Sequence, residues 1–302
     1  MNTKTIFKIH WSESIWFFDI DDTLIDTAGN TLNASEGIKR VFSAKYTKDQ
    51  SQLVQNNFNN IFELMLSGYR VKDEDDWRKV KGGKEVFNNL LNDIENSQIR
   101  IKEKYGVIKK WSREVFVKLA AEKAGLKVTP ALVHEAVDAY WLILTEQTIA
   151  YPHALNLIQK IKARSRPIYL ITSSDGRLKM DNEGQFDYDP QYSAALKRQR
   201  IELLREKGVI FNAVSIGDPE DKPHQDFFEK GLKIAENDLG SILDTSHVII
   251  VGDSFGGDLQ TPKEKMGFGL VVLFEKDRSN TEVVDEHQIT TGILSEVANF
   301  LV

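Results

Sequence analysis

Five residues that could do chemistry follow three short apolar runs of the sequence, within seven positions of the end of each run. Asp19 and Asp21 follow the first run, Thr172 follows the second, and Asp253 and Asp258 follow the third. If the runs are neighbouring parallel strands, these residues meet beyond the carboxyl ends of the strands, where open α/β sheets bind ligands. Crowded carboxylates repel one another unless a cation lies among them, and hard oxygen ligands of this kind suit Mg²⁺. The pattern therefore predicts a magnesium site at one edge of a sheet.

Taken singly, these features also have ordinary structural explanations. Asp21, Asp22 and Thr23 fit the turn and cap chemistry that often follows a strand. Gly252-Asp253 fits a turn that ends a strand. Neither explanation requires all of the polar residues to occur together and in this order, so we favour the functional interpretation of the set.

The elements that must position these residues are predicted from apolar runs and from helical spacing. Short apolar runs bounded by polar residues indicate buried parallel strands at Ile15–Phe18, Ile168–Ile171, Val248–Val251 and Leu270–Phe274. Helical stretches are predicted at Ala154–Ala163, Ser193–Lys207 and Gln225–Glu236. Strands that alternate with helices in this way predict an α/β fold with a doubly wound, Rossmann-like parallel sheet.

The segment 27–150 has a different pattern. Its apolar residues recur at helical spacing, for example across Phe58–Met65, and it has no comparable β-branched run. Thr129-Pro130 resembles a helix N-cap followed by proline at the first helical position. The predicted domains are therefore an α/β core domain at residues 1–26 and 151–302 and an inserted, mostly helical domain at residues 27–150.

Composition limits the possible functions. The chain has 302 residues, of which 41% are hydrophobic and 28% charged, as expected for a globular protein with a sizeable core. Its net charge of −6 argues against general binding to nucleic acid. No apolar run approaches the roughly 20 residues of a membrane helix, and the N-terminus lacks the apolar region and cleavage site of a signal peptide. The absence of cysteine excludes disulfides and thiol chemistry. We therefore expect a cytoplasmic protein that does not bind membranes.

Four motifs, in order along the chain, resemble those of the haloacid dehalogenase-like (HAD) phosphohydrolase superfamily. FFDIDDTL around Asp19 resembles its DxDxT signature, and VIIVGDSFGGDL around Asp253 is similar to its GDxxxxD motif. IYLITSS, which contains Thr172, resembles the second motif of the superfamily, and Lys222 in DKPHQDFF resembles the third. The motifs frame the chain from residue 17 to residue 259, and the first and last form a specific pair.

This resemblance implies a mechanism through an aspartyl-phosphate. Asp19 would be the nucleophile that attacks phosphorus, and Asp21 would protonate the leaving alcohol and later deprotonate the attacking water. Thr172 and Ser173 would bind the phosphoryl oxygens. Lys222 would neutralise charge on the transferring group and on Asp19.

The resemblance also implies a magnesium ion, held by the Asp19 carboxylate, the backbone carbonyl of Asp21 and Asp253. Asp258 would be a further ligand or the residue that orients Lys222, and the sequence leaves both roles open. Asp21 favours phosphate esters, because dehalogenases of the superfamily, which protonate no alkoxide, carry another residue at that position. The expected activity is hydrolysis of a small phosphomonoester by a Mg²⁺-dependent HAD-like phosphatase.

Two alternatives stay open within this fold. A phosphomutase or other phosphotransferase would need a stable phosphorylated Asp19. A non-catalytic phosphate-binding member of the fold would be expected to have lost at least one chemical residue, and none is lost here. A GDSL-type serine esterase is disfavoured, because those enzymes carry their Gly-Asp-Ser block near the N-terminus and here it begins at Gly252.

Departures from the family pattern concern the substrate rather than the chemistry. The helical insertion resembles a C1-type cap, which closes over the site and supplies substrate contacts. Asp22 stands where many relatives have glycine. The acidic, aromatic stretch Asp175–Tyr192 fits an ordinary surface loop better than a second lid. Arg177 within it could reach a substrate anion, although such an arginine more often pairs with a carboxylate.

Overall fold

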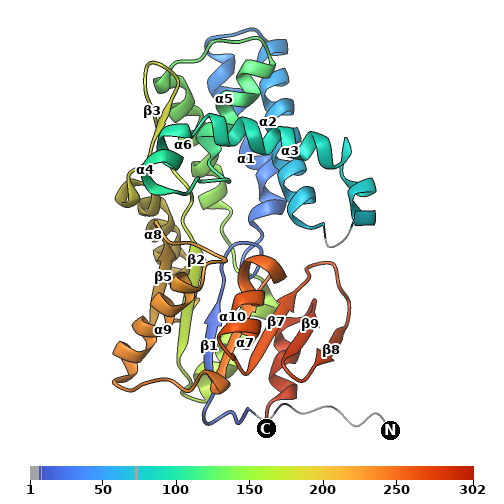
Figure 1. Cartoon of the computed structure of the whole chain (residues 1–302), viewed down its shortest axis with the longest axis vertical. Helices are drawn as coiled ribbons and strands as arrows, with labels where there is room; N and C mark the ends of the chain where they lie inside the picture. Colours follow the sequence, from blue (N-terminus) through green and yellow to red (C-terminus); the bar gives the residue numbers. More distant parts are fainter. Residues whose placement is uncertain (1–6, 8, 72–73) are drawn as a thin grey trace. The chain divides into compact units, whose positions relative to one another are not determined.

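The computed structural model describes residue 7, residues 9–71 and residues 74–302 (Figure 1). The N-terminal segment, which we do not expect to be a signal peptide, lies partly outside these described residues. The chain divides into two compact units. Unit 1 consists of the described residues up to Ala28, of Thr148–Ser173 and of Arg198–Val302, and unit 2 consists of Gly29–Gln147 and Ser174–Lys197.

Unit 1 is built on a seven-stranded sheet with the order β5-β2-β1-β6-β7-β9-β8. Neighbouring strands are parallel, except that β8 and β9 are antiparallel. The strands are β1 Ile15–Phe18, β2 Ile168–Ser173, β5 Ala213–Gly217, β6 Val248–Gly252, β7 Leu270–Phe274, β8 Thr281–Asp285 and β9 Gln288–Thr291. The mostly parallel sheet confirms the predicted α/β class.

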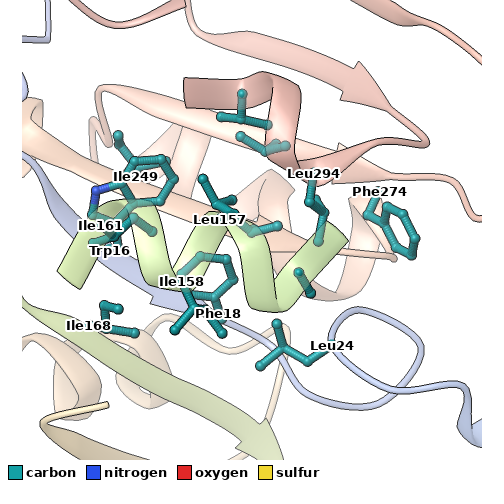
Figure 2. Close-up of a cluster of buried hydrophobic side chains, with 14 of the residues drawn as sticks. Trp16, Phe18, Leu24, Leu157, Ile158, Ile161, Ile168, Ile249, Phe274 and Leu294 are labelled. Atoms are coloured by element: carbon teal, nitrogen blue, oxygen red, sulfur yellow. The ribbon is translucent and has the colours of Figure 1, made fainter. Parts of the chain in front are cut away.

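Helical elements pack on both faces of this sheet. They are α7 Pro152–Ala163, α8 Pro190–Glu206 from Arg198 onward, α9 Gln225–Leu239, α10 Gln260–Lys265, and the short turns η2 Thr245–His247, η3 Phe255–Leu259 and η4 Leu294–Phe300. Alternate residues of a strand point to opposite faces. Trp16 and Phe18 therefore pack with α7 and η4 (Figure 2), whereas Phe17 packs with α9. This two-sided packing confirms the doubly wound arrangement.

The four strands expected from apolar runs are present, and β1 and β7 have the predicted bounds. The sequence did not indicate the other three strands of the sheet. β5 is only partly buried, β8 is exposed along much of its length, and β9 is buried but contains only one apolar residue, Ile289. None of the three therefore forms an apolar run.

Unit 2 is mostly helical. Its helices are α1 Thr27–Ser43 from Gly29 onward, α2 Lys48–Tyr69, α3 Gly83–Asn96, α4 Ile99–Tyr105, α5 Arg113–Lys123 and α6 Pro130–Glu146, with the 3₁₀ turn η1 Glu74–Lys79. The Thr129 hydroxyl accepts the Leu132 N–H at the start of α6, which confirms the predicted cap. Phe58 and Tyr140 make an edge-to-face contact in the interior. Among the described residues, no helix is long and apolar enough to cross a membrane.

Ser174–Lys197 groups with unit 2, whereas the predicted boundaries assign it to the core domain. The expectation of an ordinary surface loop at Asp175–Tyr192 is wrong. The segment contains the hairpin strands β3 Lys179–Met180 and β4 Phe186–Asp187 and the start of α8. The Met180 N–H donates to Nε2 of His134 at 3.0 Å, and Phe186 is fully buried. Isolated apolar residues among acidic ones give no periodic pattern, so the sequence did not reveal this packing.

Arg177 is buried in this segment and binds carboxylates of unit 2. Its Nε donates to Oε1 of Glu114 at 2.5 Å, and its Nη2 donates to Oδ1 of Asp138 at 2.6 Å. The Glu114 side chain is fully buried, whereas that of Asp138 is 65% exposed. The arginine therefore pairs with carboxylates of the protein itself, and one of these pairs lies in the interior.

The two carboxylates should differ in their contribution to stability. Glu114→Gln leaves a buried guanidinium without its closest charge partner, and we expect the free energy of unfolding to fall by about 3 kcal/mol. Asp138→Asn removes an exposed partner of the same arginine and should cost at most about 1 kcal/mol. Urea unfolding of both variants measures the difference, and equal losses would show that the buried pair has no special role.

Candidate active site

Asp19 directly follows β1 at the carboxyl edge of the sheet. Its N–H donates to the carbonyl of Val251 in β6 at 2.9 Å, and its Oδ2 accepts the Thr23 hydroxyl at 3.0 Å. Burial raises the pKa of Asp19 to about 7; the Lys222 charge opposes this rise, and neighbouring carboxylates add to it. Asp19 is therefore a fixed, buried carboxyl group whose negative charge needs compensation.

Lys222 lies in the turn before α9, between two carboxylates. Its Nζ is 2.5 Å from Oδ1 of Asp19 and 2.7 Å from Oδ1 of Asp258, and its side chain is only 8% exposed. Burial by itself would lower the pKa of Lys222, but the two carboxylates outweigh burial and raise this pKa above its usual value. The ammonium group therefore stays charged and holds Asp19 and Asp258 on either side of it.

Asp258 can reach Lys222 because Gly252, at the end of β6, has no side chain. A Cβ atom at Gly252 would lie 2.5–2.7 Å from side-chain atoms of Asp258. The other carboxylate oxygen of Asp258 accepts the Ser254 N–H at 3.0 Å. Asp258 therefore contacts Lys222 directly, as one of its two expected roles requires.

Asp19, Asp253 and Asp258 form an acidic group that could hold a cation. One carboxylate oxygen of each lies within 4.8 Å of the others. Loss of hydration raises the pKa of Asp253 well above its usual value, and repulsion from Asp258 and Asp19 raises it further. Lys222 supplies one positive charge against three carboxylates. The donor set therefore fits a hard divalent cation such as Mg²⁺.

Thr172 and Ser173 end β2, which lies beside β1 in the sheet. The Thr172 hydroxyl donates to the carbonyl of Ser173 at 3.3 Å, and the Ser173 hydroxyl donates to Oδ1 of Asp221 at 2.7 Å. The same oxygen of Asp221 accepts the Lys222 N–H at 2.8 Å. Asp221, which the sequence did not single out, therefore connects the second motif to the third.

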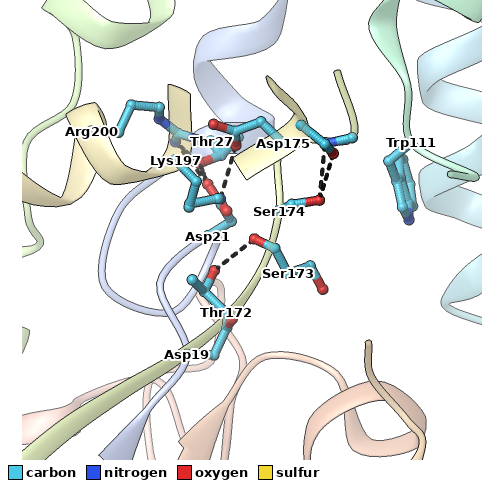
Figure 3. A network of polar contacts seen from close by, with 12 residues as sticks. Asp19, Asp21, Thr27, Trp111, Thr172, Ser173, Ser174, Asp175, Lys197 and Arg200 are labelled. Carbon is cyan, nitrogen blue, oxygen red and sulfur yellow. Dashed lines mark hydrogen bonds and ion pairs between the residues drawn. The ribbon is translucent and has the colours of Figure 1, made fainter. Parts of the chain in front are cut away.

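Asp21 contacts a different cation, Arg200. Its Oδ1 accepts the Thr27 hydroxyl at 2.6 Å and Nη2 of Arg200 at 2.8 Å (Figure 3). The Arg200 side chain is 2% exposed, whereas that of Asp21 is 28% exposed. A partly exposed carboxylate is thus held by a buried guanidinium.

Arg200 was not among the predicted site residues. It lies in a stretch of α8 that is rich in basic residues, which resembles a solvated helix face. One signal could have revealed it. Arg200, Ile201 and Leu204 share the inward face of the helix, and all three are buried. An arginine on an inward face requires a carboxylate partner.

Asp22 has a left-handed backbone conformation, with φ of 60°. Glycine adopts this conformation without strain, and aspartate tolerates it better than most residues. Its Oδ1 accepts the Ala28 N–H at 2.7 Å, near the start of α1. The departure from glycine at this position is therefore compatible with the turn.

Comparison with protein families identifies the chain. Residues 15–264 match the family model described as haloacid dehalogenase-like hydrolase. The match covers most of the sequence, and the chain belongs to this hydrolase family. A search of curated proteins found no significant match.

Solved structures share the fold over nearly the whole chain. One of them is YfnB of Bacillus subtilis, a provisionally named HAD hydrolase that was solved with magnesium bound. Its identity to this chain is 13% and the TM-score is 0.55, and the match covers 95% of this chain and 98% of that chain. A HAD phosphatase of Thermococcus onnurineus has 15% identity and a TM-score of 0.50 over 95% and 96% of the chains. A provisionally named β-phosphoglucomutase of Thermotoga maritima has the same identity and TM-score over 95% and 97%. At these identities the likeness shows the fold alone.

The space beside Gly252 provides a test of the arrangement around Asp258. Gly252→Ala forces the Asp258 carboxylate from its position, and we expect the free energy of unfolding to fall by about 1–3 kcal/mol. Gly256→Ala is the matched control, because a Cβ atom at Gly256 meets no atom within 4 Å. Thermal unfolding should separate the two variants, and a Gly252→Ala protein as stable as the control would contradict the close contact.

Proposed function

We propose that this protein is a Mg²⁺-dependent phosphomonoester hydrolase that forms an aspartyl-phosphate on Asp19. The observation that carries the proposal is the contact of Lys222 with both Asp19 and Asp258 at the edge of the sheet. In this arrangement a buried cation can neutralise both the attacking carboxylate and the phosphoryl group that approaches it. The substrate is a small phosphorylated metabolite, and unit 2 is the cap domain.

In the first half of the reaction, a carboxylate oxygen of Asp19 attacks phosphorus. As the new P–O bond forms, the bond from phosphorus to the substrate oxygen breaks, and Asp21 gives its proton to that oxygen. The Thr172 and Ser173 hydroxyls turn from their present acceptors to the phosphoryl oxygens. Lys222 neutralises part of the negative charge during the transfer.

In the second half, a water molecule attacks the phosphorylated Asp19. Asp21, now a carboxylate, accepts a proton from the water, and the bond between phosphorus and the Asp19 oxygen breaks to release phosphate. Asp19, Asp253 and the backbone carbonyl of Asp21 would hold Mg²⁺, with Asp258 close by. Bound Mg²⁺ supplies positive charge that screens the nucleophile from the phosphate dianion.

The family also contains dehalogenases, which displace halide and therefore have no alkoxide to protonate. Asp21 would have no task in such a reaction. In this chain the Asp21 carboxyl group accepts hydrogen bonds from Thr27 and Arg200. A fixed acid at this position supports ester hydrolysis over dehalogenation.

Phosphate release from a panel of phosphomonoesters tests the proposal. We expect release by the wild type with Mg²⁺, none with EDTA, and a loss of at least about 10⁴-fold in Asp19→Ala, because the covalent step needs this carboxylate. Circular dichroism and thermal unfolding of the variant verify that it folds.

The other outcomes discriminate between the remaining functions. Turnover that survives in a folded Asp19→Ala protein would exclude the covalent mechanism. Formation of a phosphorylated Asp19 that returns its phosphoryl group to product, without release of phosphate, would indicate a mutase. Halide release from 2-haloacids in place of phosphate release would indicate a dehalogenase.

Mg²⁺ should bind more tightly at high pH than at low pH. Asp19 has a pKa of about 7 in the folded chain, against an ordinary value of 3.8 in the unfolded chain. Between these values the folded chain keeps a proton that the unfolded chain has lost, so this group makes the metal-free protein less stable as pH rises through the window. At pH values above about 7, Asp19 has already lost its proton, so Mg²⁺ binds without displacing it.

We therefore expect Mg²⁺ to raise the melting temperature more at about pH 8 than at about pH 5.5. Differential scanning fluorimetry with and without Mg²⁺ measures the shift. In Asp253→Asn the shift should be small at both pH values, because the acidic group has lost one charge. An equal shift at both pH values in the wild type would contradict the raised pKa.

A further inference from the structure

The partners of Asp21 form a compact group within unit 1. The Oδ1 of Asp21 accepts from Thr27 at 2.6 Å and from Nη2 of Arg200 at 2.8 Å, and the same Nη2 lies 3.3 Å from the Thr27 hydroxyl. One carboxylate oxygen, one hydroxyl and one guanidinium nitrogen thus contact one another (Figure 3). This group fixes the direction in which the Asp21 side chain leaves the backbone.

Arg200 itself has little freedom to move. Its side chain is among the largest fully buried ones of the described chain, and the next residue on α8, Ile201, packs in the same hydrophobic cluster as Trp16 and Phe18. Separating this guanidinium from its carboxylate is unfavourable, because the buried guanidinium has lost most of its hydration. The buried Arg200 side chain therefore holds Asp21 in place within unit 1.

Charge gives a second reason for an anchor at this position. The negative charge of Asp21 raises the pKa of Asp19, so the two carboxylates repel each other. Lys222 contacts Asp19 and Asp258. Arg200 places positive charge on the other side, against Asp21, and so opposes the repulsion that would drive the Asp21 carboxylate out toward solvent.

We propose that Arg200 is a positioning residue that holds Asp21 where it delivers its proton to the leaving oxygen. This inference rests on the proposed function. In this proposal Arg200 acts through Asp21 and not on the substrate directly. The step concerned is the breaking of the bond from phosphorus to the substrate oxygen, in which the Asp21 proton moves to that oxygen while Asp19 forms the new bond to phosphorus.

Dependence on the leaving group separates positioning from a purely structural role. Proton donation matters most when the leaving oxygen is strongly basic, and a displacement of about 1 Å can cost roughly 10²-fold in rate. The constant kcat/KM reports on the steps up to formation of the aspartyl-phosphate. We would measure it for phenyl phosphate and for phosphates of progressively more acidic phenols, ending with 2,4-dinitrophenyl phosphate.

For Arg200→Gln we expect kcat/KM to fall by roughly 10²-fold with phenyl phosphate and by less than about threefold with 2,4-dinitrophenyl phosphate. Arg200→Lys keeps the charge but not the planar fork, and it should recover part of the loss. Arg205→Gln is the matched control. Arg205 is on the same helix, but its side chain is 52% exposed and pairs with Glu202, so this variant should behave as the wild type.

A double-mutant cycle gives a second readout. In an Asp21→Asn background the proton donor is already absent, so adding Arg200→Gln should change kcat/KM for phenyl phosphate by less than about twofold. If Arg200 acts independently of Asp21, the two losses multiply instead. Thermal unfolding of every variant separates a loss of folded protein from a loss of rate.

The outcomes separate this inference from the proposed function. A wild type without Mg²⁺-dependent and Asp19-dependent hydrolysis would overturn both. An active wild type whose Arg200→Gln variant loses the same factor with every leaving group, or gains activity with phenyl phosphate, would overturn the positioning role and leave the phosphatase in place. A loss that grows with the basicity of the leaving group, together with a cycle that is not additive, supports the inference.

Discussion

Repulsion among carboxylates at the carboxyl edge of the sheet is the constraint on which the remaining features of the site depend. The parallel strands β1 and β6 bring Asp19 and Asp253 to the same edge, and the turn after β6 adds Asp258. Such a group is stable only with positive charge inside it. Lys222 supplies one such charge, and Gly252 leaves the space that lets Asp258 reach it. The uncompensated charge that remains favours a divalent cation.

The sequence predicted the parts of the fold in which burial produces a regular pattern. The strands that carry the motifs are buried on both faces, so they appear as continuous apolar runs, and their bounds were predicted to within two residues. Strands at β5, β8 and β9 are half-buried, exposed or polar, and their pairing is a property of the assembled sheet. The predicted boundaries placed Ser174–Lys197 in the core domain, whereas this segment groups with unit 2. The sequence does not show this grouping, because contacts such as that of Arg177 with Glu114 join residues far apart in sequence.

Prediction of the site had a similar limit. Residues at the ends of the main strands could be found, because position after an apolar run and residue type together restrict what a carboxylate can do. Asp221 and Arg200 could not be found in this way. Asp221 lies in a polar turn, and Arg200 lies in a helix where basic residues are common. Their importance comes from the partners that the fold gives them, namely Ser173 and Asp21.

The surroundings of Asp19 and Asp21 differ although the two residues are only two positions apart. Asp19 is buried, contacts Lys222 and belongs to the acidic group, as the proposed attack on phosphorus beside a cation requires. Asp21 is more exposed and is held by Arg200 and Thr27, outside that group. In the proposed mechanism Asp19 is the nucleophile and Asp21 the proton donor, and these two roles need different surroundings. The separate cations Lys222 and Arg200 provide that difference within a single short motif.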